Sequence, residues 1–285
     1  MQKINLNTLF QKLKKDCISI KSTPANVHLP LGSSKFGGKP HLPANFSWPY
    51  YEGTDYENIT QNRPLAFLAQ INLQDIAAYD KEKLLPAKGF LYFFYELSSM
   101  TWGYDPKDKG SAAVYYFDEE VHHLHEVEFP KERDPESILP EFSMAFENKT
   151  DLPDFEEFTD YYEDCDWDDF DKARETFGYD DYPEDDEGTK LLGYADIIQN
   201  SMLLECEYTA NGIYCGDGNI KLTPQEKQVF FDRSKEWTLL FQMSTLESDD
   251  FELMFGDCGN IYFYIKKSDL AQTNFDNIWL VLQCS

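Results

Sequence analysis

Hydrophobic and polar positions follow the same order in two separate parts of the chain. In each part an apolar run ends in Gln, and a Gly then opens a stretch of alternating aromatic residues. The two copies cover residues 65–70 with 89–95, and residues 239–242 with 259–265. The interval from Gln to Gly is 19 residues in the first copy and 17 in the second. Such self-similarity indicates a duplicated β-rich unit.

Shorter patterns add helices and further strands. Apolar residues at helical spacing predict an amphipathic helix over residues 3–15, which we expect to pack as a lid on the first sheet. Strands are predicted over residues 112–117 and 121–127, joined by an acidic hairpin-like turn. A Thr223 ahead of a proline predicts another helix start.

These elements predict an α+β fold with antiparallel-rich sheets and short flanking helices. We expect one compact unit over residues 1–285, with two related halves at 30–130 and 191–285 and an acidic insertion at 151–187. The insertion carries 18 Asp or Glu against two basic residues. Because aromatic residues are interleaved with these acids, we expect one side of the insertion to pack on the body of the protein.

The net charge of the chain limits the classes of partner that it is expected to bind. The formal net charge is −27 over 285 residues. Nucleic acid and anionic membrane surfaces are disfavoured, because binding to phosphate requires clustered Lys and Arg. A basic protein or a divalent cation is favoured instead.

Targeting signals are not evident in the sequence. No apolar run reaches the roughly 18 residues of a membrane-spanning helix, and the N-terminus lacks the apolar core of a signal peptide. The six cysteines are scattered without a CxxC pair. We therefore expect a cytoplasmic protein with free thiols.

Acidic residues at regular spacing give the first candidate site. Asp164, Asp166, Asp168 and Glu175 match positions one, three, five and twelve of an EF-hand calcium loop. Asp169 stands at position six, where that loop requires Gly, so the calcium-like ligand set is incomplete. The same face, with Asp164, Asp166, Asp168 and Asp169, is alternatively a docking surface for a basic partner. No other cofactor is indicated.

Two glutamines and two tryptophans are the remaining candidates. Gln70 and Gln242 occupy equivalent places in the two copies, and a buried amide must find hydrogen-bond partners. Each glutamine either ties its strand to a neighbouring loop or lines a cleft between the halves. Trp48 and Trp102 belong either to an aromatic core or to an aromatic ligand groove.

The chain resembles the YwqG-like family of bacterial proteins, a family of unknown function. The resemblance covers residues 30–283 and is carried by residues 37–43 (GGKPHLP), 65–73 (LAFLAQINL), 85–94 (LPAKGFLYFF), 191–194 (LLGY), 240–242 (LFQ) and 256–265 (GDCGNIYFYI). It implies a mixed α+β fold and brings no established activity, cofactor or catalytic residue.

Three classes of function stay open. The sequence holds no GxSxG, HExxH or P-loop motif, so no catalytic residue is assigned. The charge favours a non-catalytic interaction module, immunity-like or inhibitory, that binds a basic partner. The alternatives are a small-ligand or metal-binding protein, or an enzyme of unrecognised mechanism, using the crevice between the two halves.

Overall fold

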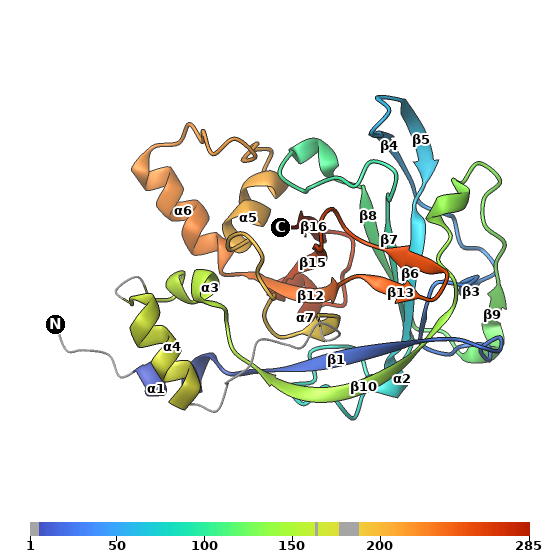
Figure 1. The fold of residues 1–285 in the computed structure, drawn as a ribbon, viewed down its shortest axis with the longest axis horizontal. Helices are drawn as coiled ribbons and strands as arrows, with labels where there is room; N and C mark the ends of the chain where they lie inside the picture. The colour runs from blue at the N-terminus through green and yellow to red at the C-terminus, as the bar shows by residue number, and fades with distance from the viewer. Residues whose placement is uncertain (1–5, 163–164, 177–187) are drawn as a thin grey trace.

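A computed structural model describes residues 6–162, 165–176 and 188–285. Its main feature is one antiparallel sheet of ten strands, in which β1 and β10 form a long central ribbon (Figure 1). In sheet order the strands are β16 (Trp279–Gln283), β15 (Asn260–Lys266), β12 (Trp237–Met243), β11 (Lys190–Leu192), β1 (Lys15–Pro24), β10 (Phe142–Asp151), β2 (Lys35–Phe36), β6 (Ala66–Asn72), β7 (Phe90–Tyr95) and β8 (Ala112–Phe117).

Smaller elements surround this sheet. The two-stranded ribbons are β3 (His41–Pro43) with β9 (Leu124–Glu126), β4 (Tyr50–Thr54) with β5 (Thr60–Pro64), and β13 (Leu246–Ser248) with β14 (Phe251–Leu253). The α-helices are α1 (Leu6–Leu13), α2 (Leu73–Ile76), α3 (Phe155–Thr159), α4 (Trp167–Thr176), α5 (Leu203–Ala210), α6 (Pro224–Ser234) and α7 (Lys267–Ala271). Short 3₁₀ turns are η1 (Pro106–Asp108), η2 (Val121–His123) and η3 (Pro135–Ser137). Among the described helices, none combines the length and the apolar character needed to cross a bilayer.

The central ribbon separates the two halves of the sequence. On one side β10 pairs with β2, and the sheet continues through β6, β7 and β8. On the other side β1 pairs with β11, and the sheet continues through β12, β15 and β16. The predicted pairs β6–β7 and β12–β15 are both present and antiparallel, so the expectation of an antiparallel-rich α+β fold is confirmed.

The aromatic strands alternate between two cores. Phe93 on β7 meets Phe241 and Phe263 of the second half, with ring centroids 4.4 and 5.4 Å apart. Their neighbours Tyr92 and Tyr262 pack in separate clusters on the other face of the sheet. Because successive side chains on a strand point to opposite faces, each half contributes one row to a shared core and one to its own outer cluster.

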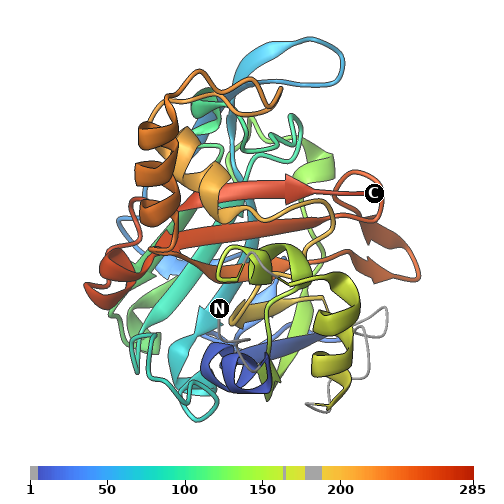
Figure 2. The same cartoon turned by 90° about the vertical axis from the view of Figure 1, so that its left-hand side faces the viewer.

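Different elements cover the two outer clusters. In the second half α5 packs on β12 and β16, and α6 packs on α5 (Figure 1, Figure 2). In the first half the outer cluster includes Leu42 of β3, Leu124 of β9 and the half-buried Phe46 and Trp48. The ribbon β3–β9 therefore takes the place that a helix takes in the second half.

The N-terminal helix forms with different partners from those predicted. Phe10 of α1 stacks on Phe158 of α3 and packs against Phe170 of α4, with ring centroids 5.1 and 5.4 Å apart. The helix is therefore not a lid on the first sheet, because its apolar face is buried by the aromatic residues of the acidic segment. Among the described aromatic residues of this segment, Phe158 and Phe170 are buried, Phe155 and Tyr162 are partly buried against them, and Trp167 remains 45 % exposed. Phe177, which was also expected to pack inward, lies outside the described residues.

One further expectation needs correction, and two strands were missed. The predicted strand 121–127 is the turn η2 followed by β9, and β9 pairs with β3 instead of forming a hairpin with β8. Leu124 explains this arrangement, because it is buried in the outer cluster of the first half. The strands β10 and β16 were not predicted, although β10 lies at the centre of the sheet.

A loop between β7 and β8 protects the edge strand β16. The amide of Leu282 donates to Trp102 O at 3.1 Å, and the indole of Trp279 donates to Gly103 O at 2.8 Å. Exposed strand edges invite pairing with other chains, so this loop both completes hydrogen bonds and blocks association.

The close approach of this loop gives a first prediction. Gly103 and Gly212 have nearly equal φ angles of 83° and 84°, but a Cβ at Gly103 meets Leu280 O at 2.0 Å whereas Gly212 has nothing within 4 Å. In urea unfolding, Gly212→Ala is expected to cost about 1 kcal/mol for its left-handed backbone. Gly103→Ala is expected to cost about 3 kcal/mol, because the loop must also move off β16. Equal losses would contradict the contact.

Candidate functional site

Two buried lysine–glutamine pairs lie on either side of the central ribbon. Lys35 on β2 stands opposite Gln70 on β6, and Lys190 on β11 stands opposite Gln242 on β12. Lys190 is 6 % exposed and the other three are fully buried. The burial expected for both glutamines is therefore observed, and each has a lysine as its cross-strand neighbour.

Gln70 is bonded at both ends of its amide. Its Oε1 accepts the amide N–H of His41 at 2.8 Å, and its Nε2 donates to Ser33 O at 2.7 Å. Tyr92, its neighbour on β7, donates its hydroxyl to His41 O at 2.6 Å. These bonds attach the Gly/Pro-rich loop of the first half to the sheet.

Gln242 makes the same set of bonds in the second half. Its Oε1 accepts the amide N–H of Asp196 at 2.9 Å, and its Nε2 donates to Gly188 O and to the Asp196 carboxylate. Tyr262, its neighbour on β15, donates its hydroxyl to Asp196 O at 2.6 Å. Asp196 therefore occupies the place that His41 has in the first half.

Each buried lysine is paired with a carboxylate of the central ribbon. Lys35 Nζ lies 2.6 Å from Glu141 Oε1, just before β10 begins, and 2.8 Å from Lys39 O. Burial lowers the pKa of Lys35, and the bond to Glu141 opposes that shift. Lys190 Nζ lies 3.1 Å from Asp151 and 2.7 Å from Asp196. Although burial opposes its charge, these two carboxylates hold the pKa of Lys190 well above its ordinary value.

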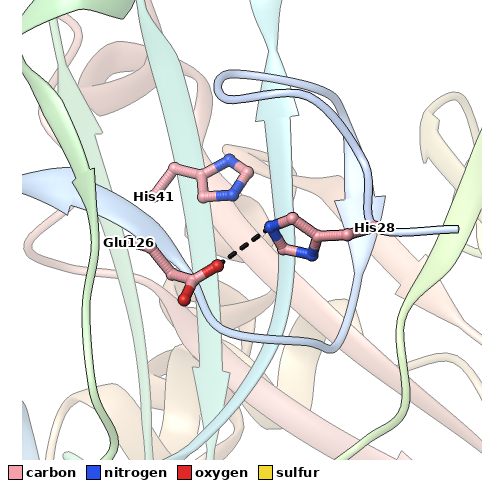
Figure 3. Close-up of side chains that lie close together, drawn as sticks. All are labelled: His28, His41 and Glu126. Atoms are coloured by element: carbon pink, nitrogen blue, oxygen red, sulfur yellow. Dashed lines mark ion pairs between the residues drawn. The ribbon is translucent and has the colours of Figure 1, made fainter.

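Beside Lys35, the described residues include one cluster with the composition of a metal site. Ligand atoms of His28, His41 and Glu126 all lie within 4.8 Å of one another (Figure 3). A metal-bound histidine normally donates its second N–H to an acceptor. In His41 that second nitrogen, Nδ1, instead faces two donors, the Gly32 N–H and the Gln70 amide nitrogen, each at 3.0 Å. Lys35 Nζ, 3.3 Å from Nε2, would also repel a cation. The cluster does not fit a metal.

The same cluster fits an ion bridge. His28 Nε2 lies 2.9 Å from Glu126 (Figure 3). Its Nδ1 lies 3.2 Å from Glu141. Both ring nitrogens of His28 face carboxylate oxygens, and each can donate to one of them when the ring is doubly protonated. His28 is exposed, so the bridge contributes little to stability.

A crevice of about 530 Å³ lies where the two halves and β1 meet. Its walls are Lys15 and Asp16 at the start of β1, residues 82–86 of the first half, and residues 192–193, Thr238 and part of 267–273 from the second half. Three of the six described non-glycine residues with positive φ line it, namely Lys83 (55°), Leu192 (62°) and Thr273 (57°). Residues held in this conformation cluster at functional sites.

Three lysines and two acids line the crevice. Lys15 Nζ lies over the Tyr194 ring, 3.7 Å from its centroid, and 3.5 Å from Gly193 O. Burial lowers the pKa of Lys15, Glu157 opposes this shift, and the charge of Lys267 adds to it. Burial has the opposite effect on a carboxyl group and raises the pKa of Glu157 to about 7. No described lining residue is a histidine, cysteine or serine, and the crevice offers three ammonium groups, two carboxylates, two threonine hydroxyls and apolar walls.

The acidic candidates lie elsewhere, and their roles stay predictions. Asp164 falls outside the described residues. Asp166, Asp168 and Asp169 are exposed around the start of α4, where the Asp166 carboxylate accepts the Asp169 N–H at 2.8 Å. Asp168 and Glu175 both lie on α4, so about 10 Å of helix separates them along its axis.

The two tryptophans lie in different surroundings, and both are outside the crevice. Trp48 packs against Phe94 in the outer cluster of the first half, with ring centroids 5.4 Å apart, and donates to Leu65 O at 2.9 Å. Trp102 is 41 % exposed and holds β16 through its backbone. Neither residue is among those that line the crevice.

Sequence reasoning missed the lysines of both clusters and of the crevice. A signal for the first two was present, because Lys35 precedes His41 by six residues and Lys190 precedes Asp196 by six. Aligning back from the glutamines does not find the pairs, because Gln70 follows Lys35 by 35 residues and Gln242 follows Lys190 by 52. Lys15 had no comparable signal, because only the fold brings β1 to the crevice.

The glutamine bonds give a second prediction. Gln70→Leu and Gln242→Leu are each expected to lower the free energy of unfolding by about 1–3 kcal/mol, because buried backbone groups lose their partners. Gln74→Leu, at an exposed position on α2, serves as the control and is expected to change stability by less than about 0.5 kcal/mol. Urea unfolding measures all three, and a neutral result at Gln70 and Gln242 would contradict the structural role.

A third prediction concerns pH. Burial and then the charge of Lys35 lower the pKa of His41 to about 4, against about 6.5 in the unfolded chain. Between these values the unfolded chain binds more protons, so stability falls as the pH drops through this window. His41→Asn keeps an acceptor and removes the titration. From pH 8 to pH 5 the native protein is expected to lose about 2 kcal/mol more than this variant. Parallel urea-unfolding profiles for the two proteins would contradict it.

Comparison with known proteins places this fold in a family. Residues 34–284 match the model of the family described as a domain of unknown function, DUF1963. A search of curated proteins gives no match. Because the match covers more than half of the chain, including both buried clusters and most of the crevice, the protein belongs to the DUF1963 family.

Proposed function

We propose that this protein binds a small ligand in the crevice between its two halves. The observation that carries the proposal is the composition of the crevice wall, which takes residues 82–86 from one half and residues 192–193 from the other. Its volume of about 530 Å³ falls in the range of about 300–1,000 Å³ of small-molecule sites, which favour such junctions. Three left-handed non-glycine residues in the wall add support.

We further infer that the halves descend from one duplicated unit. The buried Lys–Gln pairs, their tyrosine neighbours and the shared spacing of six residues support this inference. Each glutamine also follows a register shift in its strand, at Phe67/Ala69 on β6 and at Leu239/Phe241 on β12. A duplication creates a junction between equivalent surfaces, and the crevice lies at that junction.

Two finer assignments belong to the same proposal. The phrases quoted from the sequence support placing the chain among the bacterial YwqG-like proteins. The six cysteines, all of them free thiols, support action in the cytoplasm.

Docking of a basic partner stays a separate prediction. Its support is the exposure of Asp166, Asp168 and Asp169 at the start of α4. Exposed acids are common on proteins whose charge serves solubility. The crevice has the more specific geometry, so we give it precedence.

A crevice-filling variant tests the proposal. Ala271, exposed on α7, lines the crevice, and Ala271→Trp should fill part of it. Ala145→Trp is the matched control, because Ala145 is exposed on β10 and is not among the residues that line the crevice. Saturation-transfer NMR against a metabolite library is expected to find ligands that bind the native protein and Ala145→Trp but not Ala271→Trp. A library without any such ligand would contradict the proposal.

A further inference from the structure

We propose that the ligand of the crevice is a small amphipathic anion, with a negatively charged head at Lys15 and an apolar body against the leucine wall. This inference rests on the proposed function and names the chemical class of its ligand. It is carried by the bonding of Lys15, the charges around it and the composition of the opposite wall.

The ammonium group of Lys15 has unused hydrogen-bonding capacity. An ammonium carries three donors. Among the described residues, Nζ has one polar contact within hydrogen-bond distance, Gly193 O at the long distance of 3.5 Å. The Tyr194 ring, 3.7 Å away, stabilises the charge and accepts no conventional hydrogen bond. A ligand oxygen in the crevice would supply the missing acceptor.

The charges of the crevice favour an anion. Lys15, Lys83 and Lys267 line it, against the acids Asp16 and Glu82. Glu82 Oε1 accepts the Asp16 N–H at 3.2 Å and keeps its charge, so the lining has an excess of one ammonium group. Burial lowers the pKa of Lys15, the charge of Glu157 opposes that shift, and the charge of Lys267 adds to it. In a chain of net charge −27, a local excess of ammonium groups is the feature that would attract an anion.

The remaining wall favours an apolar body next to the charged head. Leu84, Leu85 and Pro86 line one part of the crevice, and Leu192, Leu270 and Ala271 line another. Burying apolar surface contributes about 25 cal/mol per Å² of free energy. A fully polar anion such as inorganic phosphate would leave these side chains uncovered, so an amphipathic ligand suits the crevice better.

The probe for this class is decanoate, which competes for the crevice with the fluorescent anion 8-anilinonaphthalene-1-sulfonate. Lys15→Met removes the charge and keeps an unbranched side chain, and Lys15→Arg keeps the charge. Lys227→Met, at an exposed position on α6, is the matched control. Urea unfolding of each variant verifies that it is folded.

The expected result separates charge from hydrophobicity. Lys15→Met is expected to bind decanoate about tenfold or more weakly than the native protein, while Lys15→Arg and Lys227→Met bind it within about threefold. Decanol, which has the same body without the charge, is expected to bind the native protein about tenfold more weakly than decanoate.

Each contrary outcome has a distinct meaning. If decanol matches decanoate, or if Lys15→Met binds as the native protein does, the anionic class is wrong and binding in the crevice can stand. If Ala271→Trp leaves the binding of both anions unchanged, they bind outside the crevice and the inference fails. If neither anion binds although metabolites distinguish Ala271→Trp from Ala145→Trp, the proposed function survives without this ligand class.

Discussion

The constraint on which the fold depends is the pairing of two buried ammonium ions with carboxylates of the central ribbon. A buried charge is costly unless it is paired and fully hydrogen-bonded. Lys35 meets Glu141 at the start of β10, and Lys190 meets Asp151 at its end. β10 and the residue just before it therefore supply a counter-charge to each half of the sheet. Displacing β10 would separate Lys35 from Glu141 and leave Lys190 with Asp196 alone, so these pairs favour a single register of the ribbon over its alternatives.

The second of these pairs also builds a wall of the crevice. The Asp151 carboxylate that binds Lys190 accepts the Tyr194 N–H at 2.8 Å, and a Cβ on Gly193 would lie 2.3 Å from its Oδ2. Leu192 and Gly193 are thereby held in left-handed conformations, with φ of 62° and 76°. The carbonyl of Gly193 then lies beside Lys15 Nζ. The ion pair between Lys190 and Asp151 thus also positions Gly193 beside Lys15, the residue that we assign to ligand binding.

The sequence predicted what is encoded locally and missed what depends on long-range pairing. The repeated Gln phrases located β6, β7, β12 and β15, because each carries an apolar run or alternating aromatic residues. The strand β10 was missed because its apolar Phe142 is followed by a mostly polar stretch down to Asp151, and only its pairing with β1 and β2 defines it as a strand. Residues 121–127 were wrongly predicted as one strand, because apolar residues are interspersed there with histidines. The burial of Leu124 in the outer cluster of the first half instead determines the path of this segment. The crevice was anticipated as a place between the halves, but Lys15 was not, since no sequence spacing connects it to Leu192 or Lys267.

A crystal structure of the protein with decanoate tests the central claim most directly. If the crevice binds an amphipathic anion at Lys15, a carboxylate oxygen of decanoate is expected within about 3.5 Å of Lys15 Nζ, with the alkyl chain against Leu85 and Leu270. The same crystal would show residues of both halves in contact with one ligand. Decanoate seated only outside the crevice, or inside it with its carboxylate turned away from Lys15, would contradict the account.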